Sequence, residues 1–114
     1  ISASATSNDW NASIAANANN DVYVTWSSTD PSAGVNAQVR FSGRLHTDPI
    51  GATSSGSVLF TSPAFYNPSS DNPERWGDYS AVTVDPKDPL RAWIVNEKID
   101  SATGWGSRIG EIGF

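Results

Sequence analysis

The chain of 114 residues contains no cysteine and no methionine. Without cysteine it can form no disulfide, no thiolate zinc site and no thiol nucleophile. Lysine and arginine together number 7 against 12 acidic residues, which gives a net charge of −5, and no basic run occurs. We therefore expect no binding to nucleic acid or to an anionic membrane surface. No apolar run approaches the roughly 20 residues that a membrane-spanning helix needs.

Helical periodicity is lacking as well, and no capping box precedes an amphipathic helical pattern. Short runs of alternating apolar and polar residues, separated by Gly, Pro, Asn and Asp, indicate an all-β chain instead. The clearest run is residues 22–26, in which every side chain is β-branched or aromatic. The other predicted strands cover residues 13–17, 36–41, 58–61, 79–84, 91–98 and 105–114.

The sequence does not begin with methionine. Because the sequence begins at Ile1, we expect a leader, a pro-segment or further domain sequence to precede it. The chain has few lysines and five tryptophans, and it is rich in small and polar residues. This composition is typical of secreted bacterial β proteins and predicts an extracellular or periplasmic location.

The sequence contains an internal repeat. Residues 22–26 align with residues 92–96 at an offset of 70 positions, and each run forms the centre of a predicted strand. The same or a slightly smaller offset aligns Asp30 with Asp100, Gly34 with Gly104, Ser13 with Ser80 and Trp10 with Trp76.

Repeat units of about 40 to 50 residues with four antiparallel strands are typical of β-propeller blades. We predict a lead-in at residues 1–9, a first blade with a long exit loop at 10–73, and a second, incomplete blade at 74–114. Two blades cannot close a propeller, which needs about four to eight. The remaining blades are then expected elsewhere in the polypeptide, in another chain or in copies of this one. A β-sandwich of seven strands is the alternative.

One region resembles a known family. Residues 75–80 (Arg-Trp-Gly-Asp-Tyr-Ser), followed by 84–86 (Val-Asp-Pro) and 93–97 (Trp-Ile-Val-Asn-Glu), resemble the last blade of secreted bacterial propellers of the sialidase-like (BNR/Asp-box) superfamily. Residues 105–110 are similar to the terminal strand of that blade. The resemblance covers about residues 10–114 and implies that the chain is the carboxyl-terminal part of a propeller. It carries no catalytic residue over, because the Ser-x-Asp-x-Gly-x-Thr-Trp box and a tyrosine–glutamate nucleophile pair are missing.

The long connection before residue 79 is the best candidate for a functional site. Residues 63–73 contain three prolines and form an unusually long link for a compact domain. In a propeller, the connection into the innermost strand and the loop between the second and third strands emerge on one face, a usual ligand position. Asp78 is the candidate general acid or base, or an acceptor for sugar hydroxyls. The other predicted ligand-binding residues are Arg75, Trp76, Tyr79 and Trp105, and Asp30 and Asp100 are expected on the same face.

A purely structural interpretation of Asp78 and Arg75 is favoured over the catalytic one. Asp78 would cap the turn by accepting backbone N–H bonds, while Arg75 would pair with Glu74 or Asp71. Asp71, Asn72 and Asp78 offer oxygen ligands for calcium, although their spacing matches no defined calcium loop. We expect no other metal or cofactor.

The tryptophans and the single histidine allow further predictions. Tryptophan can stack on a sugar ring, but Trp26 and Trp93 lie in the middle of predicted strands and are expected in the core. Trp76 and Trp105, next to glycines, are the better candidates for contact with a ligand. His46 has no serine motif or metal ligand near it and is predicted to lie on the surface.

Three functions remain open on these grounds. In the first hypothesis the chain is a structural or carbohydrate-binding segment of a secreted sialidase-like propeller, without catalytic residues of its own. Alternatively it is the tail of a glycoside hydrolase, with Asp78, Arg75 and Tyr79 in the pocket. In the third hypothesis it is a lectin-like module that closes a ring from several copies.

Overall fold

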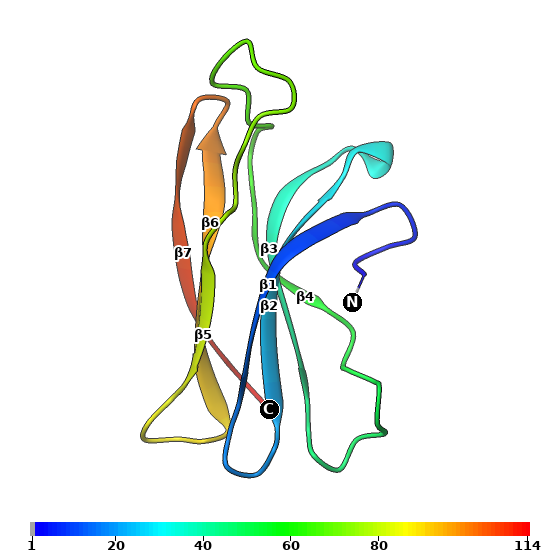
Figure 1. Cartoon of the computed structure of the whole chain (residues 1–114), viewed down its shortest axis with the longest axis vertical. Helices are drawn as coiled ribbons and strands as arrows, with labels where there is room; N and C mark the ends of the chain where they lie inside the picture. Colours follow the sequence, from blue (N-terminus) through cyan, green and yellow to red (C-terminus); the bar gives the residue numbers. More distant parts are fainter. Residues whose placement is uncertain (1) are drawn as a thin grey trace.

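A computed structural model describes residues 2–114 and contains two antiparallel sheets. The sheets have the strand orders β1-β2-β3-β4 and β5-β6-β7, so both are simple meanders (Figure 1). This confirms the all-β fold class, and every predicted strand is present. The strands are β1 (Asn8–Ala16), β2 (Val22–Asp30), β3 (Val35–Arg44), β4 (Ser57–Thr61), β5 (Ser80–Val84), β6 (Arg91–Ser101) and β7 (Gly104–Gly113), with a short 3₁₀ turn at Pro31–Ala33.

The two sheets pack face to face, with β1 against β5 and β2 against β6. Alternation along the strands supplies the apolar side chains between them, because residues two apart share one face. Gly110 allows a close approach, since a Cβ atom there would lie 2.7 Å from Leu59 Cδ1. The core between the sheets consists of Tyr23, Ala92, Ile94 and Ile112, flanked by Phe41, Leu59, Val82 and Val84.

Strand β2 is buried on both faces, which accounts for its continuous run of β-branched and aromatic residues. Tyr23 faces β5–β7, whereas Trp26 faces the other way and is nevertheless only 2% exposed. Its indole N–H donates to Asp9 Oδ1 at 2.7 Å, and Gly56 lies against the far edge of its ring. The prediction that Trp26 belongs to the core is therefore confirmed.

The same prediction for Trp93 is wrong. Its side chain is 42% exposed, and its indole N–H donates to Asp85 Oδ2 at 2.8 Å. The neighbours Ala92 and Ile94 face β1–β4, and the two-residue period of a strand turns Trp93 to the opposite side. That side of the β5–β7 sheet has no covering layer among residues 2–114.

The segment before Trp10, which was predicted to be a lead-in, is attached to the rest of the fold. Strand β1 begins at Asn8, two residues before Trp10, and pairs there with Thr29. The buried carboxylate of Asp30 accepts hydrogen bonds from the hydroxyls of Ser4, at 2.6 Å, and Thr6, at 2.9 Å. These contacts fasten the segment before β1 to the connection between β2 and β3.

The buried carboxylate of Asp21 ties the β1–β2 turn to the loop after β3. Its Oδ1 accepts hydrogen bonds from the backbone N–H of His46 at 2.8 Å and from His46 Nδ1 at 2.9 Å. Its Oδ2 accepts one from Asn17 Nδ2 at 2.9 Å. These hydrogen bonds, the one from the His46 backbone first, lower the pKa of Asp21 to about 2. The imidazole of His46 is exposed, as predicted.

We expect Asp21 to make the stability of the fold depend on pH in the acid range. Its pKa in the folded state lies below the usual 3.8, so its stabilising effect is complete above that pH and is lost as the pH falls toward 2. The Asp21→Asn variant should unfold at lower urea concentration at neutral pH and should depend less on pH in this window. Asp30, whose pKa the hydroxyls of Ser4 and Thr6 lower, titrates identically in both proteins. Parallel curves for the two proteins would contradict the prediction.

Candidate functional site

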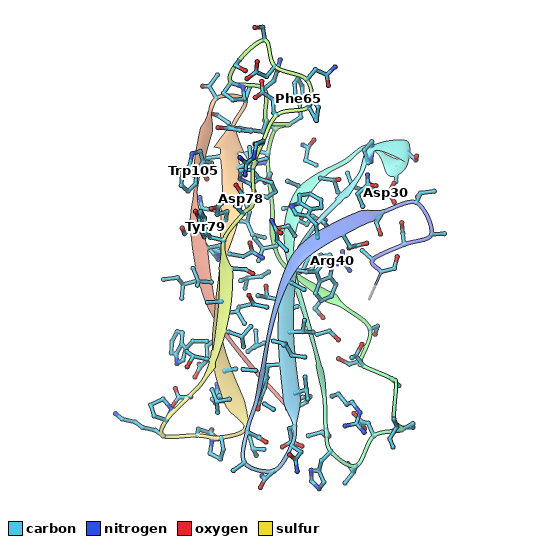
Figure 2. The ribbon with its side chains drawn as sticks, in the orientation of Figure 1. Asp30, Arg40, Phe65, Asp78, Tyr79 and Trp105 are labelled. Atoms are coloured by element: carbon cyan, nitrogen blue, oxygen red, sulfur yellow. The ribbon has the colours of Figure 1, made fainter. Side chains whose placement is uncertain are left out.

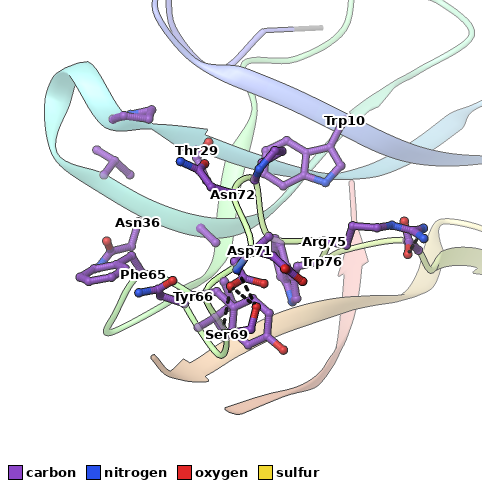
Figure 3. Close-up of a pocket in the computed structure, with 18 of the residues that line it drawn as sticks. Trp10, Thr29, Asn36, Phe65, Tyr66, Ser69, Asp71, Asn72, Arg75 and Trp76 are labelled. Atoms are coloured by element: carbon purple, nitrogen blue, oxygen red, sulfur yellow. Dashed lines mark hydrogen bonds and ion pairs between the residues drawn. The ribbon is translucent and has the colours of Figure 1, made fainter. Parts of the chain in front are cut away.

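A groove of about 1300 Å³ lies between the β2–β3 connection and the loop that joins β4 to β5 (Figure 3). One wall is formed by residues 29–37 and by Trp10 at the start of β1. The other is formed by residues 65–78, with Ile99 of β6 beneath it. The groove therefore draws residues from both sheets, at the end where the long connection crosses from one to the other (Figure 1).

The loop between β4 and β5 is held at several points along its length. The backbone N–H of Ser62 donates to Ala37 O at 2.8 Å, and Ser62 Oγ accepts from the Ile99 N–H at 3.2 Å. Further along, the Asn67 N–H donates to Ala102 O in the β6–β7 turn at 2.7 Å. These bonds fix the outer part of the loop to β3 and to the β6–β7 hairpin.

The acidic part of the loop folds on itself. Glu74 Oε1 accepts hydrogen bonds from the hydroxyl of Ser69 at 2.8 Å and from its backbone N–H at 3.1 Å. Ser69 Oγ in turn accepts the N–H of Asp71 at 3.0 Å. The side-chain carboxylate of Asp71 accepts no hydrogen bond from residues 2–114 and is exposed. It is therefore available to a ligand.

Gly77 anchors the inner part of the loop between the two sheets. Its N–H donates to the buried carboxylate of Glu97 on β6 at 2.8 Å, and its carbonyl accepts from Asn11 Nδ2 on β1. The φ angle is +82°, a conformation that favours glycine, and a Cβ atom would lie 3.0 Å from Trp10 Nε1. No other residue fits this position without displacing a neighbour.

Two tryptophans from the two repeats meet in the groove. The rings of Trp10 and Trp76 have centroids 5.9 Å apart and make an edge-to-face contact at 78°. Each is half-buried, and the buried Nε1 of Trp76 finds no hydrogen-bond partner among residues 2–114. Phe65, exposed, and Tyr66, half-buried, continue the aromatic lining along the loop (Figure 3).

Asp78 forms an ion pair with Arg75 rather than a turn cap. Arg75 donates from a terminal guanidinium nitrogen to Asp78 Oδ2 at 3.0 Å, and both side chains are exposed. The expected pairing of Arg75 with Glu74 or Asp71 is wrong, because the turn at Gly77 brings Asp78 back toward Arg75. An exposed pair of this kind contributes about 0–1 kcal/mol to stability.

The structure brings together only part of the predicted ligand face. Arg75, Trp76 and Asp78 line the groove, whereas Tyr79 and Trp105 are exposed outside it. Asp30 is buried and holds the amino-terminal segment, and Asp100 pairs with Lys98. Among the groove residues that were not predicted as ligands are Trp10, Asn36, Phe65 and Tyr66, and also Asp71 and Asn72, which were considered only for calcium.

The charge of the groove is negative. Asp71, Glu74 and Asp78 contribute carboxylates, and the one basic side chain in the lining is Arg75, already paired with Asp78. Within residues 2–114 no three acidic, histidine or cysteine side chains are grouped so that they could hold a metal ion. Chemically, the groove offers aromatic surfaces and hydrogen-bond acceptors.

Comparison of the chain with family models, with curated proteins and with solved structures gave no match. In the part of the chain that the structure covers, no helix has the length and apolar character needed to cross a membrane.

Proposed function

We propose that the chain is a pair of adjacent β-propeller blades from a secreted sialidase-like protein, and that the groove at their end binds carbohydrate. The blade interpretation is supported by how the repeats stack. Both sheets are meanders of antiparallel strands, and their first strands, β1 and β5, lie against each other between the sheets, with Ser13 Oγ 2.7 Å from Ser80 Oγ. Neighbouring blades pack one face of a sheet on the opposite face of the next, and the offset of 70 accordingly places Tyr23, on the inner face of β1–β4, at Trp93, on the outer face of β5–β7.

The observation that carries the carbohydrate proposal is the combination of side chains in the groove. Trp10, Trp76 and Phe65 offer apolar ring surface, which suits the C–H faces of a sugar. The free carboxylate of Asp71 accepts hydrogen bonds from hydroxyl groups, and charged acceptors make the stronger ones. Shape, aromatic surface and a few convergent polar groups are the usual components of a small-ligand site.

The charge distribution favours a neutral sugar. An anionic sugar would lie among three carboxylates, and the single guanidinium of the lining is already paired. Like charges at short range are costly in a partly desolvated site. Binding is favoured over hydrolysis, because Asp78 is an exposed, ion-paired carboxylate without a desolvating environment.

The test is a glycan array that pairs neutral oligosaccharides with their sialylated forms, followed by calorimetry on the strongest neutral glycan. We expect binding to neutral glycans and weaker binding to the sialylated partner. Asp71→Asn should weaken binding by about 10- to 100-fold, since a hydrogen bond to a charged group contributes about 1.5–3 kcal/mol.

A matched control is Glu111→Gln, which removes a carboxylate on β7, outside the groove. It should leave the affinity unchanged. Stronger binding of the sialylated glycan, or equal affinities for wild type and Asp71→Asn, would refute the proposal.

A further inference from the structure

The outer face of the β5–β7 sheet, the side away from β1–β4, carries large apolar side chains. Tyr79, just before β5, is 77% exposed, and Ile109 on β7 is 64% exposed. Trp93 on β6 shares this face, because Val95 lies two residues along the same strand and pairs with Ile109. Figure 2 shows Tyr79 beside the sheet on this side. A single sandwich would turn polar residues outward here.

The internal repeat and the strand register together show which positions of β1–β4 correspond to the residues on the outer face of β5–β7. The 70-residue offset places Trp93 where Tyr23 stands. Phe41 pairs with Thr25 in the first sheet as Ile109 pairs with Val95 in the second, so Ile109 stands where Phe41 does. Tyr23 is buried and Phe41 is half-buried, and both belong to the core between the sheets. The outer face of β5–β7 therefore repeats the inner face of β1–β4.

The outer face of β1–β4 repeats the inner face of β5–β7 in the same way. Ile14 pairs with Val24 as Val82 pairs with Ile94, so Ile14 occupies the place of Val82. Val82 packs in the core, whereas Ile14 is 70% exposed. Val58 on β4 is a second exposed apolar side chain on this face, beside Arg40 and Trp26.

The charges on the outer face of β5–β7 do not oppose docking. Glu111 is paired with Arg91 at 3.1 Å, and Asp85 accepts the indole N–H of Trp93. A docked layer would therefore meet side chains whose polar groups already have partners, which lowers the cost of removing water from the face.

We propose that the outer face of β5–β7 docks on the outer face of β1–β4 of a second copy of this chain, in a head-to-tail contact made through Ile14 of β1 and Val58 of β4, because the outer side of β2 is already covered within the chain. This rests on the blade interpretation above and not on carbohydrate binding. A head-to-tail contact is heterologous and closes into a ring when its rotation allows. Two to four copies would supply the roughly four to eight blades of a closed propeller.

The first test is the mass of the folded chain by native mass spectrometry and light scattering over a range of concentrations. We expect the wild type to form a closed oligomer, a multiple of 12.1 kDa. Trp93→Ser removes an apolar side chain from the outer face of β5–β7, and Ile14→Ser removes one from the outer face of β1–β4. Each variant should therefore be monomeric. Ile50→Ser removes an apolar side chain that is 98% exposed on the loop after β3 and should assemble as the wild type does.

The decisive test is a mixture of the two monomeric variants. Trp93→Ser retains the outer face of β1–β4, and Ile14→Ser retains that of β5–β7, so one contact can form between them and no second contact can follow. The mixture should give a one-to-one dimer and nothing larger. Should either variant fail to fold by near-ultraviolet circular dichroism, Ile109→Ser and Val58→Ser replace the pair.

Two outcomes would overturn the inference. One is a wild type that stays monomeric at every concentration. If such a monomer binds neutral glycans, the carbohydrate proposal still holds and only the docking inference fails. The other is a dimer that survives Ile14→Ser but not Trp93→Ser, because that result means that two β5–β7 faces pack on each other symmetrically. A ring that forms without binding any glycan would instead refute the carbohydrate proposal alone.

Discussion

Replacing Ile94 by alanine is expected to lower the free energy of unfolding by roughly 2–5 kcal/mol, as other buried Ile→Ala changes do. Ile94 is completely buried at the centre of the core, in one cluster with Tyr23 and Ile112. The loss combines the transfer of methylene groups with the cavity that they leave. The sheets cannot close this cavity easily, because Gly110 and Leu59 are already in contact beside it. Urea denaturation at neutral pH measures the change.

Ile109→Ala is the matched control for Ile94→Ala. It removes the same atoms one strand away, from a side chain on the outer face of the sheet. In dilute solution, where any assembly has dissociated, it should cost less than about 1 kcal/mol. Because a small domain has only about 5–15 kcal/mol of stability, the milder Ile94→Val, at about 0.5–1.5 kcal/mol, provides a graded check. Equal losses for the two alanine variants would mean that the core is not where we place it.

The strands could be predicted from the sequence because their cause is local. Alternation at Val82 and Val84, with small or polar residues between them, is a property of neighbouring positions. Trp26 lies in a run without polar interruption, which is typical of a strand buried on both faces. Pro86 and the Asn-rich turn around Asn20 mark where the strands end.

The exposure of Trp93 could not be predicted in this way. Alternation shows that Trp93 and Ile94 lie on opposite faces, but it does not show which face is covered by another layer. The same limit applies to Tyr79 and Trp105, which are candidate ligands by composition and yet lie outside the groove. The presence of a covering layer depends on the packing of distant elements, which short-range patterns do not contain.

The groove was predictable in its location more than in its contacts. The length of the loop before Tyr79 indicated a site, and the repeat aligned Trp10 with Trp76. Their contact, however, arises because the two sheets pack face to face and bring the start of β1 against the loop before β5, which no short-range pattern specifies. The pairing of Arg75 with Asp78 depends likewise on the positive φ of Gly77, and no spacing rule specifies it.

Substitution of Gly77 by alanine is expected to cost roughly 2–4 kcal/mol and to disrupt the groove. An L-residue in the left-handed conformation of Gly77, φ +82°, costs about 1–2 kcal/mol by itself. The added methyl group would also lie 3.0 Å from Trp10 Nε1 and 3.5 Å from Ser27 Oγ. Relief of this crowding moves the Gly77 N–H away from the buried carboxylate of Glu97, which then lacks its hydrogen bond. Urea denaturation and glycan titration of the same variant measure both effects.

The Gly51→Ala variant separates the backbone cost of the left-handed conformation from the crowding around the added methyl group. Gly51 has nearly the same conformation, φ +85°, but nothing lies within 4 Å of where its Cβ atom would be. It should therefore show only the backbone cost, about 1–2 kcal/mol, and leave glycan affinity intact. The excess loss in Gly77→Ala then measures how firmly the base of the groove is held between Trp10 and Glu97. If Gly77→Ala and Gly51→Ala lose the same stability, the loop around Gly77 moves to make room for the added methyl group at no further cost. The groove would then not be a rigid site assembled from both sheets.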